Sequence, residues 1–513
     1  MAIRLAVIAM AGLWSASGVS GTSAGPPESS TPILLGDGGM IESSTGPGGI
    51  RMVPARRASP GQAPPPSCRM PTVLRDGERS WKLYGRGDAG WVLAVSTDGM
   101  AWREAPGALK VPADGRAGFT PFLDDRPGVP GEEKYKALGG SVEVGGLFVL
   151  ASADGRAWGK LAPEPVIASA AEEAFYGRNS AVWSAVERAY VAFVSERRGG
   201  RRVVSRSTSK DFRRWSRPSP LKLSADGEDV WSLTVWSVDT NPPLLMGLLT
   251  RTAAGKAGPA DLCLATSRDG GRTFARPAAE AWIRPPAGAA DWRAMVASAP
   301  VAFVRSRPWT PHREEAFYAG GRRYEVFHNR LLACAARALT PALPADDPGA
   351  WASRSITTRP FVVTGSSLEL NASTDSYGTI RVEILGADGK PLPGYRQADS
   401  RPDSYIWVPV DPARRAAELR RTSMDIYGDS PRMRVCWRYK HRGNPEKRSR
   451  IQWWPDWDLG ELKGRTVRLR FVMNGADLFG FRTVDRPPQE GKPVVFSKQF
   501  PAGMMMGHVE AGQ

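Results

Sequence analysis

Short apolar stretches, many of them alternating with polar residues and bounded by turn residues, dominate this chain. Stretches such as GWVLAV (90–95), GLFVLA (146–151) and DLCLAT (261–266) predict β-strands. Long segments with helical periodicity are scarce, and Trp is plentiful at 18 residues. These features favour an all-β fold.

A turn motif follows four of these strands at nearly constant spacing. The copies STDGMAW, SADGRAW, SKDFRRW and SRDGGRTF begin at Ser96, Ser152, Ser209 and Ser267, which are 56, 57 and 58 residues apart. A fifth unit contains REEAFYAGG, which begins at Arg313. Units of about 57 residues with about four short strands are the size of propeller blades. The sequence predicts a five-bladed β-propeller over residues 68–345, and six blades stay open as an alternative.

The rest of the 513-residue chain divides around this propeller. Alternating segments at 356–374 and 464–482 predict a β-sandwich over 346–490. An Arg-rich insertion at 411–450 interrupts it, and its first part is expected to form a short surface helix. Residues 491–513 are expected to be a tail. Residues 25–67 are rich in Gly, Pro and Ser and predict a disordered linker.

Residues 1–24 have the pattern of a secretory signal. Arg4 precedes an apolar run at 5–14, and small residues follow at 22–24. The run is too short to span a bilayer comfortably, and no later segment is apolar enough to do so. We therefore expect no membrane span after signal cleavage and a secreted or periplasmic protein.

The formal net charge of +17 has two interpretations. An anionic partner such as an acidic glycan or nucleic acid is one, and a charge spread over a solvated surface is the other. The basic residues are dispersed, with the densest cluster at 197–202 in an expected hairpin turn, and no nucleic-acid-binding motif is present. Four Cys without a CxxC motif and four His without ligand spacing predict no metal and no cofactor.

The repeated turn has a chemistry that explains its composition. The Asp side chain can accept backbone N–H groups, the Ser hydroxyl can cap the loop, Gly supplies positive φ and the aromatic residue packs beneath. Four copies cannot line one active site. Asp98, Asp154, Asp211 and Asp269 are therefore predicted to be structural.

These turns resemble the Asp-boxes of sialidases and other glycan-processing propellers. The copy at Ser267 matches the full pattern, and the other three are one residue shorter. Together with PTVLRDGERSWKLYGRG and FTPFLDDRPGVPGEEKYKALGG, the chain resembles bacterial propeller–sandwich proteins of the glycosyl hydrolase family 32 and 43 type. The resemblance implies a glycoside hydrolase that acts on a polysaccharide or oligosaccharide through two carboxylates.

The central funnel of a propeller is lined by the innermost strand of each blade, and seven carboxylates fall in such stretches: Asp124, Asp125, Glu228, Asp229, Asp291, Glu314 and Glu315. The resemblance points to Asp124, Glu228 and Glu315 as catalytic. The alternative for each is a solvated loop carboxylate.

Two positions favour a different function. Tyr176 and Ser184 stand where the resemblance leads one to expect acids. The alternative function is a non-catalytic propeller with a degenerate site that binds glycan or a surface partner. Three Trp residues could stack on sugar rings or pack in the core: Trp183, Trp231 and Trp236.

Overall fold

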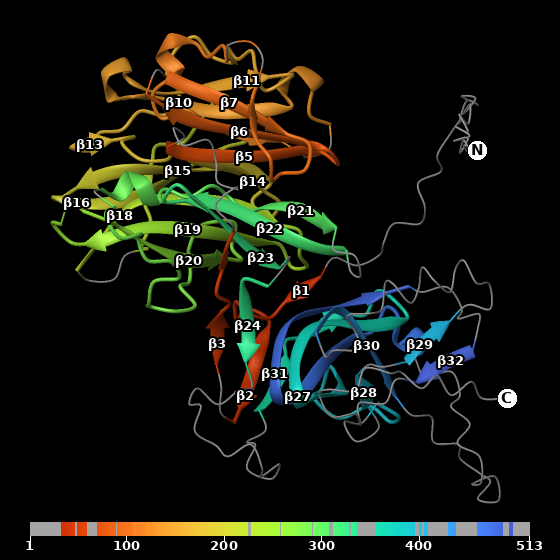
Figure 1. Ribbon diagram of the computed structural model, residues 1–513. Coiled ribbons are helices and arrows are strands. Elements are labelled where there is room, and N and C mark those ends of the chain that lie inside the picture. Colours follow the sequence, from red (N-terminus) through yellow and green to blue (C-terminus); the bar gives the residue numbers. More distant parts are fainter. Residues whose placement is uncertain are drawn as a thin grey trace, which may run out of the picture.

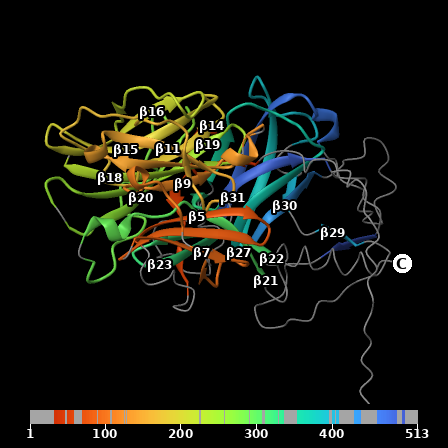
Figure 2. The same ribbon diagram turned by 90° about the horizontal axis from the view of Figure 1, so that it is seen from above.

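The computed structural model describes residues 32–46, 49–58, 354–395, 400–402, 405–408, 429–437, 459–485, 492–495 and, apart from gaps of at most four residues, 69–335. The described residues form β-strands and short 3-10 turns, without an α-helix, so the predicted all-β fold is confirmed. Two units are visible, a group of small sheets and one curled sheet (Figure 1, Figure 2). The predicted signal at 1–24 lies outside the described residues. Within them, no helix is long and apolar enough to cross a membrane.

The first unit consists of five antiparallel sheets that follow one another along the chain. The first sheet contains β5 (Arg69–Gly77), β6 (Ser80–Gly87), β7 (Gly90–Ser96) and β8 (Arg103–Glu104), and the second contains β9 (Thr120–Leu123), β10 (Tyr135–Ser141), β11 (Gly146–Ser152) and β12 (Gly159–Lys160). The third contains β13 (Glu173–Ala174), β14 (Ser180–Ser184), β15 (Ala189–Arg198), β16 (Arg201–Ser209) and β17 (Ser219–Pro220). The fourth contains β18 (Glu228–Val238), β19 (Leu244–Ala253) and β20 (Asp261–Ser267), and the fifth contains β21 (Val301–Ser306), β22 (Pro311–Ala319), β23 (Arg322–Phe327) and β4 (Arg56–Arg57).

The innermost strands of these sheets form a ring. Strand β5 contacts β9, β9 contacts β14, β14 contacts β18, and β21 returns to β5. The 3-10 turn η5 (Trp292–Met295) contacts both β19 and β5 and so links the fourth sheet to the first. This closed arrangement is the predicted propeller.

The ring has two distinct ends. Neighbouring strands within a sheet are antiparallel, so the third strand runs in the same direction as the innermost strand. The repeated turns follow third strands and therefore lie at the same end as the carboxyl ends of the innermost strands. We call this the turn end, and the opposite end the amino end.

The N-terminal segment corrects the predicted linker. Part of the stretch 25–67 is ordered: β1 (Ile33–Leu34) pairs with β31, β2 (Ile41–Thr45) with β25, β3 (Ile50–Met52) with β24 and β4 with β23. Ile33, Leu35 and Met40 are buried in the core of the curled sheet. Glycine and proline separate these short strands without preventing them, because their pairing uses backbone groups and a few apolar side chains.

The second unit is a curled sheet around its own core. It contains β24 (Leu332–Ala335), β25 (Arg354–Thr358), β26 (Phe361–Val362), β27 (Ser367–Gly386), β28 (Ser400–Pro402), β30 (Asp429–Trp437) and β31 (Thr466–Val484). Strands β27 and β31 pair along almost their whole length with register breaks, which let one sheet bend over the core. Val467, Leu469 and Phe471 are buried and alternate with polar residues, as the sequence pattern predicts.

Three boundaries differ from the sequence prediction. Strand β24 lies within the range predicted for the propeller but pairs in the curled sheet. Strand β30 lies within the predicted insertion and pairs with the central strand β27. Strand β32 (Lys492–Val495), in the predicted tail, pairs with β29 (Tyr405–Val408). The helix expected at the start of the insertion lies outside the described residues.

Candidate functional site

The four repeated turns share one hydrogen-bond pattern. In the first, the Ser96 hydroxyl donates to Asp98 Oδ1 at 2.8 Å, and the same oxygen accepts the N–H groups of Met100 at 2.7 Å and Ala101 at 2.9 Å. Asp154, Asp211 and Asp269 accept the corresponding bonds. Burial alone raises the pKa of Asp98, but these backbone hydrogen bonds outweigh it and lower the pKa. The carboxylates therefore hold the turns, as predicted.

Asp124 is buried in an ion-paired cluster at the turn end. Lys136 Nζ lies 2.8 Å from Asp124 Oδ2, and both side chains are fully buried. The Tyr190 hydroxyl, from the next sheet, donates to the same oxygen. Arg126 lies 3.3 Å from it and covers the rings of Trp183 and Tyr190 at 4.9 and 4.7 Å. Asp124 thus joins the second and third sheets.

The same cluster occurs one sheet earlier, around Asp76. Lys82 Nζ pairs with Asp76 and donates to the Tyr135 hydroxyl at 2.8 Å, and that hydroxyl donates to Asp76. The two tyrosines are equivalent, because Tyr135 and Tyr190 each pair across the sheet with the serine of a repeated turn. Copies of a cluster at different interfaces cannot all line one active site. Asp76 and Asp124 therefore have a structural role, like the aspartates of the repeated turns.

Glu228 is also ion-paired with basic side chains. It begins β18 at the amino end, and its carboxylate pairs with Arg251 and, at 2.6 Å, with Arg276. Asp124 follows the carboxyl end of β9, so the two residues lie at opposite ends of the propeller. Their catalytic role stays a prediction, and they cannot flank one scissile bond.

Glu315 lies on the second strand of its sheet rather than on the innermost strand. It pairs with Ala302 of β21, near the amino end, and its side chain is half-buried. Glu315 and Glu228 therefore share an end of the propeller but belong to different sheets. Among the three residues predicted to be catalytic, Glu228 and Glu315 are the two that lie at the same end of the propeller.

Arg178 crosses the interior of the ring. It precedes β14 of the third sheet, and its guanidinium donates to Thr72 Oγ1 at 2.6 Å and to the carbonyls of Met70 at 2.9 Å and Pro71 at 2.5 Å, all in β5. The first and third sheets are not neighbours, so this contact spans the space that a funnel would occupy. Burial lowers the pKa of Arg178 to about 10, which leaves it protonated at neutral pH.

The Trp residues predicted to stack on sugar rings pack against other side chains of the protein. Trp231 is 7% exposed, stacks on Trp292 with ring centroids 4.6 Å apart, and has the Arg202 guanidinium 4.7 Å from its centroid. Tyr176, at one of the positions where an acid was expected, donates its hydroxyl to the Glu196 carbonyl at 2.8 Å. Trp183 and Trp236 are partly buried and pack against core clusters.

Ser184, the other such position, is 1% exposed, and its hydroxyl accepts the N–H of Glu187 at 3.2 Å. Neither position offers a free functional group to a substrate.

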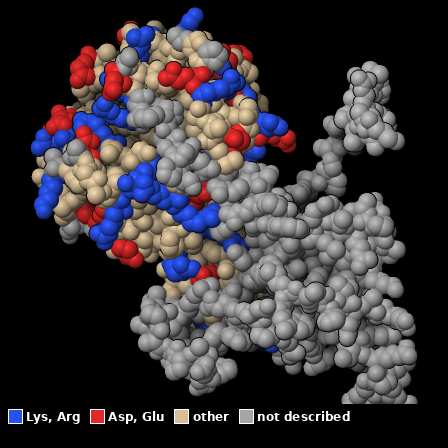
Figure 3. Space-filling model, in the orientation of Figure 1, with Lys and Arg blue, Asp and Glu red and all other residues tan. Residues whose placement is uncertain are grey.

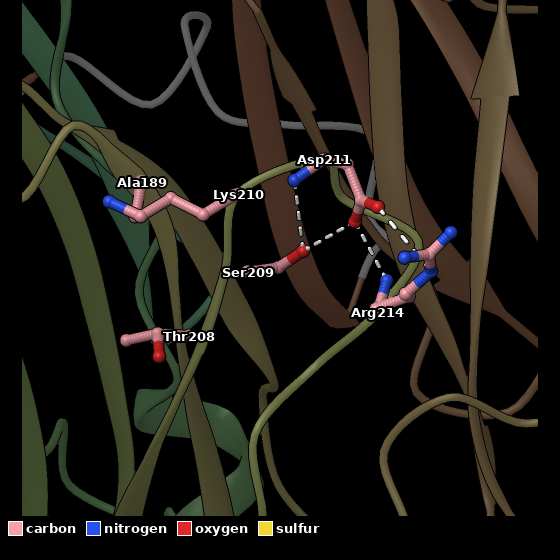
Figure 4. A pocket seen from close by; sticks show the side chains of 6 residues that line it. All are labelled: Ala189, Thr208, Ser209, Lys210, Asp211 and Arg214. Atoms are coloured by element: carbon pink, nitrogen blue, oxygen red, sulfur yellow. Dashed lines mark hydrogen bonds and ion pairs between the residues drawn. The ribbon is translucent and has the colours of Figure 1, made fainter.

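A shallow pocket lies beside the third repeated turn. It has a volume of about 300 Å³, and six residues line it: Ala189, Thr208, Ser209, Lys210, Asp211 and Arg214 (Figure 4). Asp211 Oδ1 accepts from Ser209, and its other oxygen lies 3.9 Å from Arg214 Nε. On the face of the propeller drawn in Figure 3, Lys and Arg are interspersed with Asp and Glu, with one denser band of Lys and Arg.

Sequence reasoning missed Asp76, Arg178 and this pocket. The sequence did contain a signal for the Asp76 cluster, because Lys82 and Lys136 each stand one residue after the aromatic residue that pairs with a turn serine.

The described residues contain no group of three or more His, Cys, Asp or Glu able to hold a metal ion. Cys263 and Cys334 are buried free thiols.

Comparisons with known proteins give distant likenesses. No family model matches the chain. No curated protein matches it. Similar solved structures include an N-acetylgalactosamine deacetylase from F. plautii (15% identity, 56% of this chain and 96% of that chain, TM-score 0.38) and an endo-arabinase from Bacteroides thetaiotaomicron VPI-5482 (13%, 57% and 99%, 0.38). An exo-inulinase from Aspergillus awamori is similar over 83% of this chain and 98% of its own, at 13% identity and a TM-score of 0.34. The strand pairing, rather than these likenesses, shows the fold.

Proposed function

We propose that the protein is an exported carbohydrate-binding propeller that does not cleave its ligand by a paired-carboxylate mechanism. Carbohydrate as the ligand class rests on the resemblance of the repeated turns to Asp-boxes, and export rests on the pattern of residues 1–24.

The observation that carries the absence of cleavage is Arg178. A funnel that accepts a sugar chain needs open space between non-adjacent sheets, and three hydrogen bonds from one guanidinium close that space between the first and third sheets. The carboxylates give the same result. Paired-carboxylate hydrolysis needs two groups about 5–10 Å apart on either side of one bond. Asp124 is held in a repeated interface cluster at the other end from Glu228.

A hydrolase remains the second candidate, for one reason. Glu228 and Glu315 both lie near the amino end, where the innermost strands begin. A pair formed by these two residues would have to work with Glu228 held between Arg251 and Arg276. Such pairing favours the ionised carboxylate, which suits a nucleophile or base better than an acid.

One experiment separates the two candidates. The mature protein is screened against a panel of neutral and acidic polysaccharides, with binding and reducing-sugar release measured on the same samples. Binding without release supports the proposal. Release that disappears in Glu228→Gln, while the near-ultraviolet circular dichroism is unchanged, would establish the hydrolase. Failure to bind any member of the panel would remove carbohydrate as the ligand.

A further inference from the structure

The pocket at the third repeated turn contains two cations that the turn itself does not need. Lys210 and Arg214 occupy the positions that Ala153 and Ala157 occupy in the second turn, which makes the same hydrogen bonds around its aspartate. The turn would therefore form with alanine at both positions. The hydrogen bonds of the turn therefore do not account for the two charged side chains.

Both cations are placed to act on a ligand. Lys210 Nζ donates to the carbonyls of Glu187 at 2.9 Å and Arg188 at 3.2 Å, which fixes the ammonium at the pocket and uses two of its three N–H groups. The Arg214 side chain is 93% exposed, and its Nε lies 3.9 Å from Asp211 Oδ2. Arg214 and Lys210 lie on opposite sides of the turn in Figure 4.

The rest of the lining selects the kind of ligand. Asp211 Oδ1 accepts from Ser209 and from the N–H groups of Arg213 and Arg214, so Oδ2, which lies 3.9 Å from Arg214 Nε, is the oxygen left to accept from a ligand. A bare anion would be repelled by this carboxylate, and a neutral sugar would gain nothing from the positive charges of Lys210 and Arg214. A sugar that carries an acidic group would satisfy both, because its hydroxyls can donate to Asp211 while its anionic oxygens accept from the cations.

The size of the pocket fits such a unit. Its volume of about 300 Å³ lies at the lower end of the roughly 300–1,000 Å³ typical of small-molecule sites. This is enough for one or two monosaccharide units, and the shallow shape lets a longer chain continue past the turn.

We propose that this pocket binds an acidic sugar unit, a uronate or a sulfated sugar, through Lys210 and Arg214. The inference rests on the proposed carbohydrate-binding function and names its ligand class. It places binding at the turn end of the propeller, away from the closed amino end.

The test uses the full mature protein and isothermal titration with a uronate oligomer and its methyl-esterified, neutral counterpart. Wild type should bind the acid form more tightly. Lys210→Ala and Arg214→Ala should each weaken that binding about 10- to 100-fold, the range of a charge-assisted hydrogen bond, and leave the esterified oligomer unaffected. Both substitutions install the residue found in the second turn, so the fold should survive, which circular dichroism checks.

Arg217→Ala is the matched control, because Arg217 is exposed on the same stretch but does not line the pocket. If Arg217→Ala weakens binding as much as Arg214→Ala, diffuse charge explains the binding and the pocket is not the site. If the acidic oligomer binds with no change in either pocket variant, the inference fails while carbohydrate binding stands. If no carbohydrate of the panel binds, the proposed function itself fails.

Discussion

Replacing Asp124 with asparagine separates a structural from a catalytic role for this residue. The substitution keeps the shape of the side chain and a hydrogen-bond acceptor for Tyr190 but removes the charge opposite Lys136. Both members of that pair are fully buried. Breaking a buried pair by removing one partner costs about 3–5 kcal/mol, because the other charge stays in a poorly solvated place. Lys136 keeps Glu133 at 3.3 Å, so the lower part of that range is expected.

Urea unfolding followed by tryptophan fluorescence measures this cost, and a calorimetric scan assigns the loss to the propeller transition. We expect Asp124→Asn to lower the unfolding free energy by about 3 kcal/mol. A double variant, Asp124→Leu with Lys136→Met, should recover most of the loss, because a buried ion pair replaced by apolar residues is often neutral or stabilising. Single-variant stability within about 0.5 kcal/mol of wild type, the usual range for surface substitutions, combined with loss of a glycan-cleaving activity, would refute the structural role.

Three further substitutions test other features. Burial alone would raise the pKa of Asp76, but hydrogen bonds from Lys82, Ser80 and Tyr135 outweigh it and lower the pKa to about 2. The stabilisation from the ionised carboxylate is therefore present above about pH 4 and is lost as the pH falls toward 2. Asp76→Asn should remove about 2 kcal/mol of the difference in unfolding free energy between pH 5 and pH 2. Phe212→Gly should cost about 2–3 kcal/mol in urea unfolding, because losing a fully buried ring outweighs the relief of its left-handed backbone, where φ is 64°; a stabilised variant would contradict this. Asp269→Ala should cost about 1–2 kcal/mol by the same measurement and leave glycan binding unchanged, and lost binding would make that turn a site.

The propeller was predictable because its signals are local and repeated. Each turn places a serine and an aspartate two residues apart, and the bond between them forms within the turn, as Ser267 and Asp269 show at 2.8 Å. Regular spacing then counts the units without knowledge of their contacts. The same reasoning excluded Asp269 from the catalytic residues.

The N-terminal segment was not predictable in this way. Its strands pair with partners hundreds of positions away, as the ion pair between Arg51 and Asp477 illustrates with a separation of 426 residues. Nothing in the composition around Ile33 or Ile50 identifies such a partner. Backbone pairing depends little on side-chain identity, so a Gly- and Pro-rich stretch can supply edge strands.

The surroundings of the candidate site residues were not predictable for a different reason. The sequence shows a carboxylate next to an apolar run but not the cations that surround it. Asp124 and Lys136 are only 12 residues apart, yet Tyr190, which completes the cluster, is 66 residues from Asp124 and belongs to the next sheet. A comparison of Lys82 with Lys136 at equivalent repeat positions would have revealed the cluster as structural, since function rarely needs the same triad twice.

A buried charge lies in the interior of the ring. Burying the Arg178 guanidinium lowers its pKa to about 10, so ionisation there is unfavourable relative to water. The fold nevertheless holds this charge, because three acceptors at the start of β5 are met by one side chain that reaches them from the third sheet. A side chain used in this way ties two non-adjacent sheets together and removes the volume that a substrate would need between them. The ligand site that we propose lies instead on the surface of the opposite end, at the third turn, where the hydrogen bonds of the turn itself do not require Lys210 and Arg214.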